Sequence, residues 1–193
     1  MKIGVLAIQG DFAEHIVMLA HLGVETAEVR LPGQLDGLDG LIIPGGESTT
    51  IGKLSLDFGL LEPLQKFGAA HAIWGTCAGA IFLSKDAGRR QPLLGLMDIT
   101  VERNAFGRQV DSFEADLDIE PLKEATHSEA AYHAIFIRAP IIASVHGKAR
   151  VLSSLPDGRI VAARQDKLLA TSFHPELTPD TRFHAYFLSL ANS

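Results

Sequence analysis

A series of short apolar runs constrains the fold of this chain most. Each run ends at a glycine-rich turn or leads into an amphipathic stretch. In the first half of the sequence these runs span residues 3–8, 24–29, 41–43 and 72–74. Short, nearly continuous apolar runs are typical of strands that are buried on both faces of a parallel sheet. Repeated strand–helix units of this kind predict a parallel sheet with helices on both faces.

The stretches between these runs predict the helices. Asp11 with Glu14 three residues later resembles a capping box, and helical spacing continues from there until Gly23. After the third apolar run, Ser48 or Thr49 is expected to cap a helical stretch that is broken in its second half.

The second half of the chain has a different pattern. Apolar and acidic residues alternate between residues 113 and 119, which predicts a strand buried on one face only. Further strands are expected at residues 135–137, 141–145, 160–163 and 168–173. Thr178 as N-cap and Pro179 in the first turn predict a final helix. Because we find no internal repeat and no linker, residues 1–193 are expected to form one α/β domain of three layers, with an open, mixed and mainly parallel sheet.

Charge and hydropathy exclude several classes of function. The 193 residues include 17 Lys and Arg against 23 Asp and Glu, a net charge of −6 without a basic cluster. Nonspecific binding to nucleic acid or to an anionic membrane is therefore not expected. The longest apolar stretch, residues 72–83, is interrupted by glycines and is too short to span a bilayer, and the first residues do not resemble a secretory signal. These features predict a soluble cytoplasmic protein.

The single cysteine, Cys77, excludes an internal disulfide and a cysteine-rich zinc site. It follows an apolar run and lies between Gly75 and Gly79, the pattern of a nucleophile elbow, in which small residues relieve the crowding of a sharp strand-to-helix turn. A helix N-terminus at this position would favour the thiolate. The alternative is an inert buried thiol at a close helix–sheet contact, and the flanking glycines favour the nucleophile.

A thiolate that attacks an amide requires a general acid for the leaving nitrogen. His174 follows the apolar run at residues 168–173, and in an extended chain Glu176, two residues on, would point to the same side and orient the imidazole. The alternative is a polar strand end at which Pro175 begins a turn. The other histidines are expected at surface or capping positions: His15, His21, His71, His127, His133, His146 and His184.

Two further patterns accompany these residues. Adjacent Gly45 and Gly46 after a predicted strand allow backbone N–H groups to face a cavity, as in an oxyanion hole, although a plain turn capped by Ser48 has the same sequence pattern. Arg103 and Arg138 lie near strand ends, where each could bind a carboxylate or remain solvated. Because the carboxyl ends of parallel strands share one edge of a sheet, we expect Cys77, the glycine turn and His174 to meet there. No metal-ligand motif, Walker loop or dinucleotide fingerprint is present, so no metal or cofactor is predicted.

The motif around Cys77 with the distal His174-Pro175-Glu176 resembles the triad-type (class I) glutamine amidotransferases. Longer segments resemble the glutaminase subunit of pyridoxal 5′-phosphate synthase, and they cover residues 6–11, 44–50, 101–114, 136–140 and 172–178. The resemblance implies a class I amidotransferase fold, which is flavodoxin-like. Residues 120–134 depart from the family by their length and their histidines.

The resemblance also implies an activity, a partner and a set of site residues. L-Glutamine would be hydrolysed to glutamate and ammonia through a glutamyl thioester, and the ammonia would pass to a synthase subunit that builds the cofactor from a pentose phosphate and a triose phosphate. By position, Cys77, His174 and Glu176 form the triad. Glutamine-binding positions are Gly46, Glu47, Ser48, Arg103, Ile137 and Arg138. Gly46 and Ala78 provide the oxyanion hole, and Gln9 and Gly10 lie near it and near the partner interface.

Three other functions use the same residues in part. A cysteine peptidase of similar fold would use the elbow and the histidine, and a noncatalytic module would bind a partner through its sheet edge. A glutaminase that feeds a different synthase, such as the one in histidine synthesis, is disfavoured by the match at residues 101–114.

Overall fold

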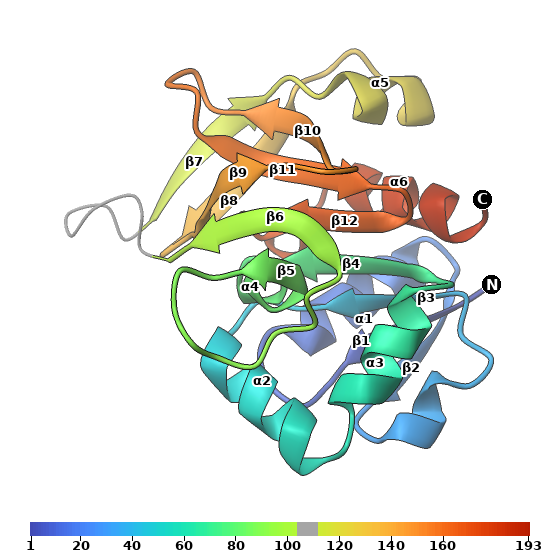
Figure 1. The fold of residues 1–193 in the computed structure, drawn as a ribbon. Coiled ribbons are helices and arrows are strands. Elements are labelled where there is room, and N and C mark those ends of the chain that lie inside the picture. The colour runs from blue at the N-terminus through green and yellow to red at the C-terminus, as the bar shows by residue number, and fades with distance from the viewer. Residues whose placement is uncertain (104–111) are drawn as a thin grey trace.

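The computed structural model describes residues 1–103 and 112–193, in which a mixed sheet forms the centre of the molecule (Figure 1). The order of the sheet is β2-β1-β3-β4-β12-β11-β9-β6-β5, and β10 pairs with β11 outside this path. Its strands are β1 (Lys2–Leu6), β2 (Glu25–Val29), β3 (Gly40–Ile43), β4 (Ala72–Thr76), β5 (Ser84–Asp86), β6 (Met97–Glu102), β9 (Ile141–Val145), β10 (Arg150–Ser154), β11 (Ile160–Gln165) and β12 (Leu168–Thr171). A separate antiparallel ribbon consists of β7 (Ser112–Leu117) and β8 (Tyr132–Ile137).

Strand direction differs between the two ends of the sheet. Neighbouring strands among β2, β1, β3, β4 and β12 are all parallel, and β1, β3, β4 and β12 are almost fully buried, as their apolar sequences predict. Beyond β12 the pairings of β11, β9 and β6 are antiparallel. The mixed, mainly parallel sheet predicted from the sequence is therefore confirmed.

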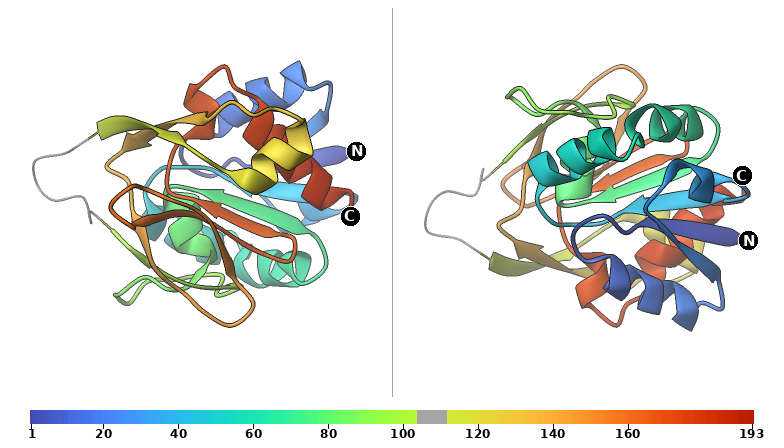
Figure 2. Two further views of the ribbon diagram at one scale, coloured as in Figure 1. Left: turned by 90° about the horizontal axis from the view of Figure 1, so that it is seen from above. Right: turned by 90° about the horizontal axis from the view of Figure 1, so that it is seen from below.

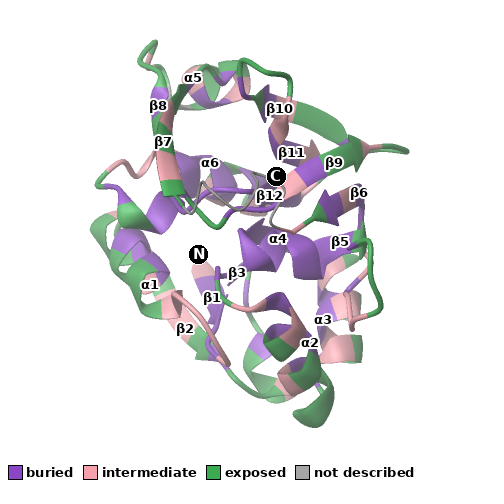
Figure 3. Cartoon of the chain, turned by 90° about the vertical axis from the view of Figure 1, so that its left-hand side faces the viewer, coloured by how far each residue is buried: buried purple, intermediate pink, exposed green. Residues whose placement is uncertain are grey.

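Helices cover both faces of this sheet (Figure 2). One face carries α1 (Phe12–His21), α6 (Arg182–Ala191) and α5 (Glu120–Thr126), and the other carries α2 (Ser48–Asp57), α3 (Leu61–Gly68) and α4 (Ala78–Leu83). The short 3₁₀ turns are η1 (Pro32–Leu35) and η2 (Pro175–Leu177). Each face has its own apolar core, and Figure 3 shows the buried residues concentrated on the central strands and on the inner sides of the helices. No helix in the described parts of the chain is long and apolar enough to cross a membrane.

The helix caps predicted for α1 and α2 are wrong. The Asp11 side chain makes no capping hydrogen bond to α1. Neither Ser48 nor Thr49 caps α2, because Glu47 is the N-cap and its longer side chain accepts a hydrogen bond from the Thr50 N–H at 2.8 Å. Asp11 and Ser48 instead line the cavity described below, and the Thr49 hydroxyl donates to Glu47 Oε2.

The start of α6 is also displaced from the prediction. Thr178 does not cap this helix; its Oγ1 accepts from the Asp180 N–H at 3.3 Å, and α6 begins at Arg182 with Thr181 as N-cap. The cause is the 3₁₀ turn at Pro175–Leu177, which delays the start of the helix. The apolar face predicted for this helix is correct, because Phe183, Phe187 and Leu190 are buried.

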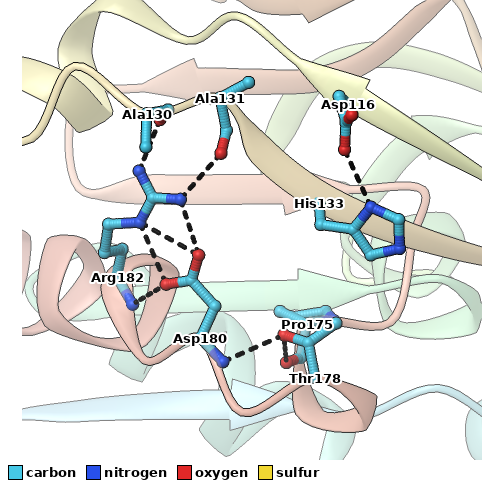
Figure 4. A network of polar contacts seen from close by, with 8 residues as sticks. All are labelled: Asp116, Ala130, Ala131, His133, Pro175, Thr178, Asp180 and Arg182. Carbon is cyan, nitrogen blue, oxygen red and sulfur yellow. Dashed lines mark hydrogen bonds and ion pairs between the residues drawn. The ribbon is translucent and has the colours of Figure 1, made fainter.

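The segment at residues 120–134 folds as α5, a loop and the start of β8. Arg182 holds the end of that loop through its guanidinium, which donates to the carbonyls of Ala130 at 2.6 Å and Ala131 at 2.9 Å and also pairs with Asp180 at 2.6 Å (Figure 4). The guanidinium lies 5.6 Å from the centre of the Tyr132 ring. Arg182 thereby ties the loop before β8 to the start of α6.

Candidate active site

Cys77 occupies a sharp turn between β4 and α4. Its backbone has φ 47° and ψ −106°, a region that is costly for a residue with a side chain, and its N–H is fixed by the Thr171 carbonyl of β12 at 2.8 Å. A Cβ at Gly79 would lie 2.0 Å from the Ile43 carbonyl oxygen, and one at Gly75 would lie 2.5 Å from the Gly79 backbone. The strand–turn–helix geometry expected of an elbow is therefore present, and both flanking glycines are required by close backbone contacts.

His174 and Glu176 follow the end of β12 and are almost fully buried. The His174 N–H donates to the Ile135 carbonyl of β8 at 2.9 Å, and His174 Nδ1 lies 2.6 Å from Glu176 Oε1. The sequence predicted this pairing from an extended chain, but the 3₁₀ turn η2 brings the carboxylate back to the ring. Glu176 Oε1 accepts the hydrogen bond from Nδ1–H of His174, so the other ring nitrogen, Nε2, is free to interact with Cys77.

Burial and hydrogen bonding set opposite trends in these two groups. Burial works against a charged His174, but hydrogen bonds with Cys77 and Glu176 outweigh it and raise the pKa of His174 to about 10. Burial raises the pKa of Glu176, and its hydrogen bond with His174 opposes this rise. The arrangement favours an imidazolium held between the sulfur and the carboxylate, which is the acid needed to protonate a leaving amine.

A cavity of about 500 Å³ opens in front of Cys77 at the carboxyl ends of the strands. Its lining is Gln9, Asp11, Gly46, Glu47, Ser48, Cys77, Ala78, Ile81, Arg103, Ile137, Arg138, Pro140, His174 and Leu177. Every site residue predicted from the sequence lines this cavity except Glu176, which lies behind His174, and Gly10 and Gly45, whose backbones lie against each other.

Gln9 shapes the glycine turn on the wall of the cavity. Gly46 has φ 151°, and a Cβ there would lie 2.4 Å from Gln9 Oε1. The same oxygen accepts a hydrogen bond from the Glu47 N–H at 2.7 Å. Gln9 therefore fixes the peptide between these two residues in a conformation that only glycine fits.

Opposite charges face each other farther out in the cavity. Arg103 Nη1 lies 2.9 Å from Glu47 Oε1. Burial acts against the Glu47 carboxylate, but hydrogen bonds from Thr49 and Thr50 prevail and lower its pKa to about 2. Arg138 is also on this side, with a left-handed backbone at φ 43°. Of the segment at residues 101–114 that resembles the family, residues 104–111 lie outside the part of the chain that the structure describes.

Three residues near the triad were not predicted. Asp11 Oδ2 lies 3.7 Å from His174 Nδ1, where a cap of α1 was expected. His15 and His184, expected at surface or capping positions, have no exposed surface and lie beside the triad in the core of one face. Helical spacing contained the signal, because His15 lies four residues before buried Leu19 and His184 three before buried Phe187.

One cluster could hold a metal by distance alone. Asp11, His174 and Glu176 each offer a ligand atom, and these atoms lie within 4.8 Å of one another. Two of the three residues are joined by the hydrogen bond between His174 and Glu176. The third residue, Asp11, lies 3.7 Å from the same imidazole nitrogen.

Comparison with known proteins identifies the family. A sequence profile of the SNO glutamine amidotransferase family matches residues 5–192. The chain belongs to this family. Pyridoxal 5′-phosphate synthase subunit PdxT of Herpetosiphon aurantiacus is similar to this chain. The two are 60% identical over 195 residues, with 98% of this chain and 100% of that protein covered. The PdxT subunit of Moorella thermoacetica is 54% identical, with 98% and 99% covered.

Solved structures agree with this family and with the fold. A crystal structure of a glutamine amidotransferase is similar at a TM-score of 0.91 and 49% identity, with 99% of each chain covered. The PurLQS structure from Thermotoga maritima has a TM-score of 0.74 at 17% identity, with 99% of this chain and 97% of that chain covered, and shows the fold alone. The class I amidotransferase fold predicted for this SNO family member is confirmed.

Proposed function

We propose that this glutamine amidotransferase hydrolyses L-glutamine to L-glutamate and ammonia with Cys77, His174 and Glu176, and delivers the ammonia to the synthase subunit of a pyridoxal 5′-phosphate synthase. The observation that carries the chemistry is the His174–Glu176 pair, at 2.6 Å, behind a cysteine held in an elbow. Membership of the family supports glutamine as the substrate. No cofactor or metal takes part in the proposed reaction.

Cys77 is the nucleophile. Its thiolate attacks the side-chain carbonyl carbon of glutamine, and the carbonyl oxygen becomes an oxyanion. Ala78 is the first residue of α4, so its N–H has no acceptor within the helix and is available to that oxygen. Gly46, shaped by Gln9, supplies the second N–H of the proposed oxyanion hole.

His174 moves the protons. Nε2–H of the imidazolium donates to the amide nitrogen as the carbon–nitrogen bond breaks, and ammonia leaves a glutamyl thioester on Cys77. The neutral imidazole then takes a proton from water, which attacks the thioester and releases glutamate. Glu176 holds the ring in one tautomer and balances its charge during the first half of the reaction.

The paired charges farther out suit the other end of the substrate. Glutamine carries an ammonium and a carboxylate on its α-carbon, and the ion pair of Glu47 and Arg103 offers one partner for each. Ser48, Ile137 and Arg138 complete this part of the proposed glutamine site. A glutamine residue within a peptide has neither the free α-ammonium nor the free α-carboxylate, so the paired Glu47 and Arg103 favour free glutamine over a peptide.

The proposed partner follows from the relatives. Two proteins named as synthase subunits match at 60% and 54% identity over nearly their whole length. Gln9 and Gly10 lie where the glycine turn meets the cavity rim, and we propose that docking of the synthase subunit acts on this turn. A cytoplasmic location belongs to the same proposal, because a reducing compartment keeps a lone catalytic thiol from oxidation.

The decisive experiment for the chemistry is Cys77→Ala. Ammonia release from glutamine is expected to fall by about 10⁴-fold or more, with an unchanged circular dichroism spectrum and melting temperature. The control is Ser55→Ala, a buried residue of α2 outside the cavity, which should retain activity. Sustained turnover by the Cys77 variant would refute the assignment.

The partner is tested by a glutaminase assay with and without the pyridoxal 5′-phosphate synthase subunit. We expect the isolated chain to be a weak glutaminase that the synthase subunit activates. Full activity of the isolated chain would contradict this coupling, and faster cleavage of a peptide than of glutamine would favour the peptidase.

A further inference from the structure

Two buried histidines, hydrogen-bonded to each other, lie behind Glu176. Glu176 uses Oε1 for His174, and its other oxygen, Oε2, is buried without a hydrogen bond among the described residues but lies 3.3 Å from His15 Nε2. His15 Nδ1 in turn lies 2.9 Å from His184 Nε2. His15 comes from α1 and His184 from α6, so α1 contacts the carboxylate of the turn after β12 directly and α6 contacts it through His15.

The surroundings keep both imidazoles neutral. Neither ring has exposed surface, and Trp74 packs against both, with ring centres 5.7 Å from His15 and 5.0 Å from His184. Burial, aided by the nearby His184 and His174, lowers the pKa of His15 well below its usual value. Burial alone lowers the pKa of His184 to about 3.

With neutral rings, a proton on Nε2 of His15 is the arrangement that places a donor, and not a lone pair, 3.3 Å from an ionised carboxylate. A carboxylate only accepts, so His15 must carry its proton on Nε2 and leave Nδ1 as an acceptor. His184 must then donate from Nε2, and its own Nδ1 is bare. That Nδ1 is buried and has no partner among the described residues, which is the expected end of a chain whose donors all point toward Glu176.

We propose that His15 is a positioning residue of the glutaminase reaction, which holds the Glu176 carboxylate ionised and oriented by donating from Nε2, with His184 selecting its tautomer. This inference rests on the proposed function. His15 touches no substrate atom and acts through Glu176, which orients the general acid His174. His15 Nε2 is hydrogen-bonded to Thr76 Oγ1 at 3.3 Å, so in this proposal its proton is shared between that hydroxyl oxygen and Glu176 Oε2.

The proposal predicts a pH effect as well as a rate effect. The titratable groups facing His15 are Glu176 from η2 and His184 from α6, with His174 at longer range. Without the His15 donor the carboxylate is less well stabilised as an anion, so it supports the imidazolium of His174 less. The pKa of His174 then falls, and activity is lost at a lower pH on the basic side.

The two side-chain amides separate the two ring nitrogens. In His15→Gln the amide nitrogen reaches the place of Nε2 and still donates to Glu176, whereas in His15→Asn it reaches only the place of Nδ1. We expect kcat/KM for glutamine to fall about 10- to 100-fold in His15→Asn, with the basic limb of the pH profile lower by about one unit, and to stay within about threefold in His15→Gln. His21→Asn, an exposed position on the same helix, is the control.

The assay uses the full chain with the synthase subunit, and thermal unfolding is recorded for each variant. An unshifted pH profile in His15→Asn, or equal loss in the Gln and Asn variants, would overturn the proposal. If no variant folds, long-range ¹H–¹⁵N NMR of the unsubstituted protein decides: a proton on Nε2 of His15 supports the proposal, and a proton on Nδ1 refutes it. Absence of glutamine hydrolysis in the unsubstituted complex would instead count against the proposed function.

Discussion

The two sides of the cavity are built differently. On the triad side, Glu176 and the histidines around it are buried and joined by short contacts, so each group has one orientation. On the glutamine side, Glu47 and Arg103 keep 40% and 28% of their side-chain surface exposed. The first side is organised before the substrate arrives, whereas the second forms an ion pair that glutamine must rearrange. Changes on the triad side should therefore alter kcat, and changes on the glutamine side should alter KM.

Of the variants that test this comparison, Glu176→Gln is expected to have the largest effect. A neutral amide cannot balance the imidazolium, and its NH₂ group would face an N–H of either His174 or His15. We expect kcat to fall about 10³- to 10⁴-fold with little change in KM, measured as ammonia release by the complex. A change confined to KM would show that the triad side is not preorganised.

Arg103→Ala tests the opposite side. Loss of a charge-assisted contact to the α-carboxylate should raise KM about 10- to 100-fold and leave kcat within a few-fold. Arg103→Lys keeps the charge but loses the planar guanidinium, so its KM should lie between that of the unsubstituted protein and that of Arg103→Ala. Equal losses of kcat in both variants would contradict a purely binding role.

The buried histidines predict an acid-sensitive core. In the unfolded chain His184 titrates near its usual pKa of 6.5, whereas burial lowers its pKa in the folded protein to about 3. The unfolded state therefore binds a proton first as pH falls through 6.5, and folding stability decreases until the folded pKa is reached. From this residue we expect about 2 kcal/mol less stability at pH 5 than at pH 7.5.

Denaturant unfolding at the two pH values measures this loss. His184→Leu removes the titrating group, so its stability should vary less with pH than that of the unsubstituted protein. An identical pH dependence in both proteins would mean that His184 is not buried as a neutral ring.

The smallest effect is expected at His133, on the exposed face of the ribbon. A hydrogen bond with Asp116 at 2.8 Å (Figure 4) and a second with Glu114 at 3.0 Å raise the pKa of this histidine. Its stabilising contribution is present below pH 6.5 and is lost as pH rises through the raised value. His133→Gln should lower the melting temperature by about 1 °C or less at pH 6, and not at all at pH 9, with glutamine hydrolysis unchanged. A loss of activity would place this face in the reaction.

The sequence predicted the parallel strands and the residues at their ends because both depend on local pattern. Buried apolar runs read directly as strands, and the glycines around Cys77 are required by backbone contacts within the same turn. Longer-range contacts were not accessible in this way. His15 and His184 are 169 positions apart, and nothing near either residue shows that the other lies beside it.

The helix caps illustrate the same limit at short range. Asp11 and Glu47 have the composition of helix starts, but each lies at a strand end that faces a cavity. There Asp11 points toward His174 and Glu47 binds both Thr50 and Arg103. Preference for a cap is a local property, and neighbouring residues do not show the tertiary partner that replaces the cap at Asp11 or that Glu47 binds in addition to capping α2.

The backbone bond from His174 to Ile135 gives the β7–β8 ribbon a place in the geometry of both sides. The strand that carries Ile135 continues to Ile137 and then to Arg138 at the cavity wall. A tilt of this ribbon by a docked protein would displace the general acid and the glutamine site together. The same movement would then change both glutamine binding and proton transfer, so a contact at the ribbon would alter the reaction without reaching Cys77.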